Sequence, residues 1–541
     1  MDNINALPIE VLEHIFNYLS VKTWNTCCLV CSLWYNILRG TQFQRRYCLS
    51  MNRTFEEPLP EAERRIFPIF HNIALVQWVD NDDDDDDDDD EEDEVSRQFW
   101  FAEHPHESDE PFSLRYLFEP KPESNIHELL FRLELDFESL ELCIPFDSYR
   151  DIVGNSLRQI KNLREFILKL CRDPTHPSNR NRWVIEHDRI ETLSIDLTVT
   201  KVEFSAILPN LKTLALLTDC GWGFQIIEKH CAQLQSLEVQ FQDAETMDKM
   251  LSLTFSNLTN LQVQLCHDRA LQEHYKLTRN NLADKETEEK FIREMPKLKK
   301  LFVESNLLMY RIAGPLSRFA HHLEELTLEC QQIDFPQLKA IETIPNLKIF
   351  RLLYSRVAST RTLPMLNMPL LKKLSLLNNE SHVTFNGGLC NLKSLKVTFW
   401  TRNSYKALHK ICQNLPKLER LELLVYSKLG NTAFRELHKL TKLVSLRIKN
   451  CQLKSIHWSH CSISSNVRRI EFTDCRLDLH MLLKILTLFP GLRELFVDSS
   501  NVAYTDAYDS SDDARYHCLQ QLRALLPNCA ISLPKSSFIQ D

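Results

Sequence analysis

Glycine is scarce in this chain of 541 residues, which contains only nine. A phosphate cradle needs several glycines close together so that backbone amides can approach the ligand, so a glycine-rich nucleotide site is excluded. The chain also lacks any run of about 18 apolar residues, the length that crosses a bilayer. Its first twenty residues have neither a basic start nor a cleavage pattern. We therefore expect a soluble protein of the cytoplasm or the nucleus that does not bind membranes.

The residue patterns of common catalytic and metal sites are also missing. There is no nucleophile elbow, no pair of carboxylates in apolar surroundings and no ladder of Cys and His as in a RING domain. The seventeen Cys show no compact, even framework, which is typical of reduced and mostly buried thiols. Cys28 and Cys31 form a CxxC without a second ligand pair. We expect no metal, no cofactor and no enzymatic activity.

What the chain does contain is an LxxLxL pattern that recurs about every 24 residues, a spacing typical of solenoids. A unit this short cannot bury its own apolar face, so neighbouring units must stack into one core. Inside a unit, Leu326 and Leu328 alternate with polar neighbours as in a strand, and apolar residues in 408–415 follow helical spacing. The first positions of the pattern are Leu130, Leu163, Ile190, Leu211, Leu234, Leu258, Leu298, Leu323, Leu347, Leu371, Leu392, Leu418, Leu443, Val467 and Leu492.

These units resemble leucine-rich repeats. The resemblance implies an α/β fold, a curved solenoid with parallel strands on its concave side and helices on its convex side. Cys266, Cys451 and Cys475 stand where that family has an Asn or Cys at the turn.

The N-terminus is unusually apolar for its length. Three short helices, at about 9–19, 23–30 and 31–38, would carry more apolar surface than forty residues can enclose, so a partner surface is expected. The run 7–38 resembles an F-box through its LP, IF and VC pairs and the Trp that follows. This implies docking onto the Skp adaptor of a cullin-RING ubiquitin ligase through Leu7, Pro8, Leu12, Ile15, Phe16, Leu19, Val30, Cys31 and Trp34. The alternative is a helical cap for the solenoid.

The patterns divide the chain into an F-box at 1–45, a connector at 46–125 and the solenoid at 126–541. The connector is too aromatic for a solvated linker, so we expect degenerate first repeats or a capping layer. Thirteen consecutive acidic residues at 82–94 repel one another and predict a disordered loop over 81–95. The insertion at 268–294 is either a helix that overhangs the groove or one divergent repeat.

Recognition of a client protein is expected on the concave strand face, where side chains point away from the core. The strand positions expected to face outward can be read from the repeat pattern. Their charged residues are mostly acidic up to the Leu323 unit and mostly basic from Leu347 to Val467. We expect an acidic or phosphorylated segment to bind there, since Arg side chains suit paired oxygens. The predicted client-binding residues are Arg351, Leu353, Lys373, Leu377, Lys396, Arg420, Leu424, Arg447, Lys449 and Arg469.

Together the two resemblances imply a substrate adaptor of an SCF ubiquitin ligase. Its F-box would recruit the Skp adaptor and the cullin, while the repeats hold a client near the ubiquitin-charged enzyme. Two alternatives stay open: an F-box scaffold that does not lead to degradation, and a repeat protein that binds nucleic acid. The formal net charge of −10 argues against nucleic acid.

Overall fold

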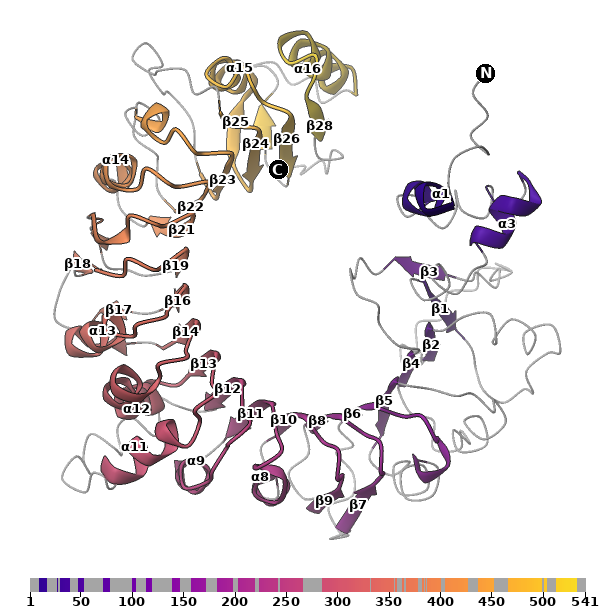
Figure 1. Cartoon of the computed structure of the whole chain (residues 1–541). Helices are drawn as coiled ribbons and strands as arrows, with labels where there is room; N and C mark the ends of the chain where they lie inside the picture. Colours follow the sequence, from indigo (N-terminus) through magenta and orange to yellow (C-terminus); the bar gives the residue numbers. More distant parts are fainter. Residues whose placement is uncertain are drawn as a thin grey trace, which may run out of the picture. The chain divides into compact units, whose positions relative to one another are not determined.

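The chain forms two compact units in this computed structural model, Met1–Phe255 and Ser256–Asp541. Both are built mainly of parallel strands in series (Figure 1). Within the parts of the chain that the structure describes, no helix is long and apolar enough to cross a membrane. Those parts are residues 9–16, 27, 30–38, 47–52, 72–77, 100–103, 113–118, 139–145, 157–171, 182–197, 203–218, 223–241, 244–265, 285–330, 332–354, 356–357, 362–363, 366–377, 382–383, 385, 387–399, 404–426, 436–451, 466–498, 501–503 and 512–532.

The first unit begins with two short helices, α1 (Ile9–Phe16) and α3 (Ser32–Leu38). Parallel pairing then runs from β1 to β2, β4, β5, β6, β8, β10 and β11, while β3 pairs antiparallel with β1. The strands are β1 (Tyr47–Asn52), β2 (Asn72–Gln77), β3 (Trp100–Glu103), β4 (Ser113–Phe118), β5 (Ser139–Pro145), β6 (Glu165–Cys171), β8 (Thr192–Leu197), β10 (Thr213–Thr218) and β11 (Ser236–Phe241).

Between these strands the chain of the first unit returns through short segments on the other side of the sheet. They are η3 (Leu157–Gln159), the parallel pair β7 (Arg182–Glu186) and β9 (Glu203–Ile207), and the helices α8 (Gly223–His230) and α9 (Ala244–Leu251). The parallel pairing of β1, β2 and β4 within the connector is in keeping with degenerate repeats. The acidic run 82–94 lies outside the described residues.

The second unit is a longer series of parallel strands, each paired with the next. Its strands line the inner side of the unit in Figure 1. They are β12 (Asn260–Leu265), β13 (Lys300–Glu304), β14 (Glu325–Glu329), β16 (Ile349–Leu353), β19 (Lys373–Leu377), β21 (Ser394–Phe399), β22 (Arg420–Val425), β23 (Ser445–Lys449), β24 (Arg469–Thr473), β26 (Glu494–Asp498) and β28 (Ala530–Ser532).

Helices and three small parallel sheets cover the outer side of this unit (Figure 1). The small sheets pair β15 (Gln332–Ile333) with β17 (Arg356–Val357), β18 (Thr362–Leu363) with β20 (His382–Val383), and β25 (Arg476–Asp478) with β27 (Asn501–Ala503). The helical segments are α11 (Lys285–Arg293), α12 (Asn306–Phe319), α13 (Phe335–Glu342), η4 (Gly387–Leu389), α14 (Ser404–Asn414), η5 (Leu437–Lys439), α15 (Leu479–Thr487) and α16 (Asp512–Leu525).

The predicted repeat pattern coincides with the core of both units. From Leu163 to Leu492 every first position of the pattern is between 0 % and 4 % exposed. Each corresponding strand begins two residues later, as β14 does after Leu323. Leu130 lies outside the described residues; the strand that continues the series there is β5, through its buried Leu140. The expected α/β solenoid of stacked strand-and-helix repeats is confirmed.

Asparagines link neighbouring repeats at the turn just before the buried leucine. The side-chain amide of Asn391 donates to the backbone oxygen of Pro369, in the preceding repeat, at 2.8 Å. The same bond recurs in other repeats of the chain. Each bond satisfies a carbonyl that the turn leaves without a strand partner. The equivalent donors are Asn210, Asn346 and Asn466, to Asp188, His321 and Thr441 at 2.6, 2.7 and 2.6 Å.

The end of the predicted insertion forms a repeat helix. Helix α11 buries Phe291 and Ile292, and its Glu288 accepts a bond from Arg311 of α12 at 2.7 Å. Both charged side chains are less than a tenth exposed. Residues 285–293 therefore belong to the solenoid, while 266–284 lie outside the described residues.

Candidate protein-binding surfaces

The first candidate surface is the N-terminal helical pair, α1 and α3. Its interior contains Leu12, Phe16 and Ile37, and Phe16 is only 2 % exposed. The rings of Phe16 and Trp34 meet edge to face, with centroids 4.9 Å apart. This geometry is favourable for aromatic pairs and fixes how the two helices pack.

Four apolar side chains of this N-terminal segment are exposed. Ile9, Val11, Ile15 and Val30 are all exposed, with Val30 at 57 %. Several exposed apolar side chains in so small a unit are typical of a protein-binding segment.

The predicted adaptor-binding residues fall into three groups in the structure. Ile15 and Val30 are exposed, while Cys31 and Trp34 are half-buried. Leu12 and Phe16 lie in the interior, where they hold the helices together. Ile9 and Val11 are exposed but were not among the predicted adaptor-binding residues, although both belong to the apolar run of the first helix. Leu7, Pro8 and Leu19 lie outside the described residues.

The second candidate surface is the strand face, by which we mean the outward side chains of strands β12 to β28. Alternate residues of β16 and β23 are buried and the residues between them are not, which gives the outward positions. At the equivalent positions of β14, β19 and β21, Thr327, Ser375 and Thr398 are buried as well. All ten predicted client-binding residues occupy outward positions. The register therefore places these side chains on one face.

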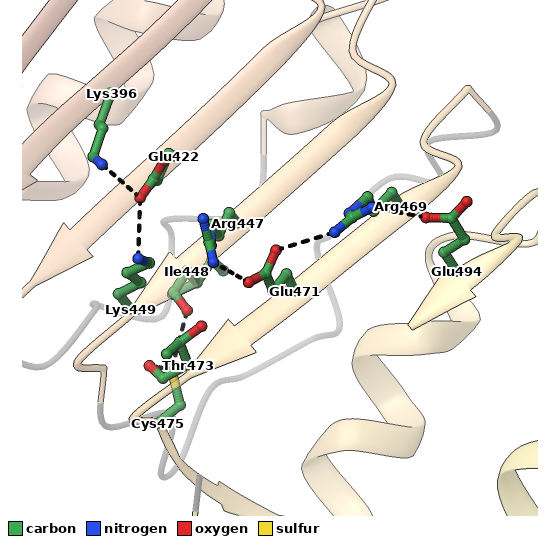
Figure 2. A network of polar contacts seen from close by, with 10 residues as sticks. All are labelled: Lys396, Glu422, Arg447, Ile448, Lys449, Arg469, Glu471, Thr473, Cys475 and Glu494. Carbon is green, nitrogen blue, oxygen red and sulfur yellow. Dashed lines mark hydrogen bonds and ion pairs between the residues drawn. The ribbon is translucent and has the colours of Figure 1, made fainter. Parts of the chain in front are cut away.

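Most bases of the strand face are neutralised by acids from neighbouring strands (Figure 2). Glu422 of β22 lies 3.2 Å from Lys396 and 3.5 Å from Lys449. It is therefore shared between strands β21 and β23.

A second chain of ion pairs crosses the next three strands. Glu471 of β24 pairs with Arg447 and, at 3.6 Å, with Arg469. Arg469 also reaches Glu494 at 3.1 Å and lies 4.5 Å from the centre of the Phe496 ring. Figure 2 shows these groups as one continuous line of alternating charge.

Earlier in the same unit, Arg351 pairs with Glu325 and donates to the hydroxyl of Thr327 at 3.2 Å. Five of the seven predicted bases thus have a carboxylate partner. Among the described residues, Lys373 and Arg420 have no carboxylate within ion-pair distance. The expected open basic surface is therefore much smaller than the sequence predicted, because acids one strand away compensate most of it.

Two acids of the strand face differ from those that form the ion pairs. Glu304 and Glu329 are half-buried at the ends of the neighbouring strands β13 and β14. Burial raises the pKa of both carboxyl groups, and the charge of Glu329 raises the pKa of Glu304 further. Within the described part of the chain, neither has a cation within ion-pair distance.

Two buried thiols of the solenoid, those of Cys412 and Cys475, are structural. Burial raises the pKa of Cys412 to about 12 and that of Cys475 to about 11, so neither forms a reactive thiolate near neutral pH. The thiol of Cys475 donates to the backbone oxygen of Ile448 at 3.4 Å, at the turn where the repeat pattern predicted it. Over the described residues there is no group of three Cys, His, Asp or Glu side chains that would suit a metal ion.

Comparison with known proteins identifies one domain. Residues 4–50 match the F-box-like family model, which covers the N-terminal helical pair. A search of curated proteins finds no significant relative.

Solved structures with similar chains are repeat proteins. A leucine-rich-repeat protein of Leptospira interrogans is 16 % identical, with a TM-score of 0.37, over 73 % of this chain and 90 % of that one. An internalin of Listeria monocytogenes is also 16 % identical, with a TM-score of 0.34, over 61 % of this chain and 82 % of that one. The assignment of the repeats rests on the strand register and burial described above.

Proposed function

We propose that this chain, an F-box-like domain followed by leucine-rich repeats, is the substrate-recognition subunit of an SCF ubiquitin ligase. The observation that carries the proposal is the exposed apolar surface of Ile9, Val11, Ile15 and Val30 inside the segment that matches the F-box-like model. Such a surface gains roughly 25 cal/mol for each Å² of apolar area that a partner covers. The partner is the Skp adaptor, which in turn binds the cullin.

The strand face of the second unit supplies the other half of the function. Its outward rows present polar, charged and apolar side chains together, which suits recognition of a protein segment. A client held there is brought close to the ubiquitin-charged enzyme, so the chain acts by raising effective concentration and not by catalysis. The ion pairs across the face leave little free positive charge for phosphates, which disfavours nucleic acid. We expect the assembly in the cytoplasm or the nucleus.

A size-exclusion experiment with purified proteins separates a ligase subunit from a scaffold. The full chain is mixed with the Skp adaptor, with and without the adaptor-binding part of the cullin. A ligase subunit carries both proteins into one peak. If the chain co-elutes with the adaptor but the cullin always elutes separately, the non-degradative scaffold is supported instead. If the chain elutes separately from both proteins, the proposal is contradicted.

A further inference from the structure

The strand face has an acidic end, Glu304 and Glu329, which has no cation within ion-pair distance among the described residues. Burial raises the pKa of both the Glu304 and the Glu329 carboxyl groups, and the charge of Glu329 raises the pKa of Glu304 further. The other acid on these two strands, Glu325, forms ion pairs with Arg351 and, at 4.0 Å, with Lys300. A cation placed between Glu304 and Glu329 would remove their repulsion.

Apolar side chains begin directly beside this acidic end. Leu353 lies opposite Glu329 in the parallel register of β14 and β16, and Leu377 lies opposite Leu353 on β19. Both are half-buried and point outward. Leu424 continues the same row on β22, one strand beyond the buried Thr398.

Diagonally across from the acids lie the two predicted bases that have no carboxylate within ion-pair distance among the described residues. Lys373 and Arg420 are exposed at the first residues of β19 and β22, and Ser394 separates them in the register. With about 4.8 Å between strands and about 3.3 Å per residue along them, Glu329 is about 16 Å from Lys373 and about 23 Å from Arg420. An extended peptide spans these distances with about five to seven residues.

We propose that the strand face binds an extended client segment of bipolar charge: a Lys or Arg between Glu304 and Glu329, apolar residues on Leu353 and Leu377, and an acidic residue on Lys373 or Arg420. The proposal deepens the proposed function, because it names the class of segment that the client site takes. A purely acidic or phosphorylated segment fits less well, since it would face two uncompensated carboxylates and only two free bases.

The test uses the full purified chain and synthetic eight-residue peptides in fluorescence anisotropy. The bipolar probe has Lys at position 1, Leu at positions 3 and 4, and Glu at position 7, and is made in both sequence directions. Matched probes replace the Lys by Gln, the Glu by Gln, or both, and one further probe carries phosphoserine and Glu only.

The expected result is tightest binding of a bipolar probe, with roughly tenfold loss for each single replacement. E304Q/E329Q should abolish the preference for Lys while keeping the preference for Glu. K373Q/R420Q should do the reverse. The control variant E494Q changes a compensated acid of the same face, and both preferences should survive in it. The preference for Lys should also weaken as the pH falls, because protonation removes the acidic end.

Three results overturn the proposal: tighter binding of the phosphoserine probe, a Lys preference that persists in E304Q/E329Q, or no probe bound above the doubly neutral peptide. Adaptor and cullin binding by the same proteins is measured in parallel. Peptide selectivity without cullin binding would contradict the proposed ligase function and leave the bipolar segment supported. Cullin binding without peptide selectivity would contradict the bipolar segment and leave the proposed ligase function supported.

Discussion

Phe16 of α1 packs edge-on against Trp34 of α3, with ring centroids 4.9 Å apart, and is almost completely buried. The pair holds the two helices together and leaves Ile15 and Val30 on the outside. Residues that a single apolar stripe predicts as one binding surface therefore have two roles. Their substitutions should have different effects.

Replacing Val30 by Glu should weaken adaptor binding without unfolding the chain. Val30 is exposed, so a charge there is solvated in the free protein but is buried unpaired in the complex. We expect at least about tenfold weaker binding, or about 1.4 kcal/mol, by isothermal titration calorimetry. The melting temperature should stay within the error of the wild type.

Phe16→Ala is the matched contrast. It empties a buried position in the helical pair, which costs about 3 to 5 kcal/mol for a large aromatic side chain. Both the helical signal of the N-terminal segment and adaptor binding should decrease together. Loss of binding in Phe16→Ala with unchanged helicity would show that Phe16 contacts the adaptor directly.

Removing one partner of the buried ion pair between α11 and α12 should be strongly destabilising. Glu288→Ala leaves Arg311 in an interior site without this carboxylate, at a cost of about 3 to 5 kcal/mol. Urea unfolding measures the change. The control is Glu245→Ala, which breaks an exposed pair with Lys249 and should cost less than about 0.5 kcal/mol. Equal effects of the two variants would contradict the structural role of the buried pair.

The asparagine bonds between repeats should contribute measurably to stability. Asn391→Ala removes a donor to the Pro369 oxygen, and we expect about 1 kcal/mol lower unfolding free energy. Gln413→Ala, an exposed change on α14, serves as the control and should have no effect. Indistinguishable denaturation curves for the two variants would refute the linking role of Asn391.

His230 should make the first unit less stable in acid. Burial lowers the pKa of this imidazole below 6.5, although its bond to the Ala206 oxygen acts in the opposite direction. The unfolded chain therefore takes up a proton more readily than the folded one, and stability falls as the pH drops below about 6.5. The comparison is thermal unfolding of wild type and His230→Gln from pH 7.5 to 5.5. The variant should lose less stability over this range, and parallel losses would show that His230 is not responsible.

The sequence predicts the repeats well because one physical requirement recurs in each of them. An apolar residue, usually leucine, at the same place in every unit must be buried, so Leu163 and Leu492 can be recognised by the same spacing. The asparagines were missed, although Asn-Leu stands at the start of several repeats, at Asn210 and Asn391 for example. Their role becomes visible only when the preceding turn is in place.

Charge pairing across strands was missed, although the repeat pattern contained a signal for it. The register gives the direction of each side chain, and it correctly places Lys396 and Arg447 outward. Side chains four residues after the first position of their repeats also lie opposite one another, which sets Lys396, Glu422, Arg447 and Glu471 in one row of alternating charge. The sum of charges along the chain hides this alternation. Glu422 and Glu471 therefore reduce a surface that reads as basic in one dimension.

Affinity purification from cells under proteasome inhibition tests the central claim most directly, with the full chain compared with a chain that lacks residues 1–40. The account predicts that the deletion loses the Skp adaptor and the cullin together, while proteins held by the strand face remain and accumulate. Recovery of the adaptor and cullin with the shortened chain, or their absence from the full chain, would contradict it.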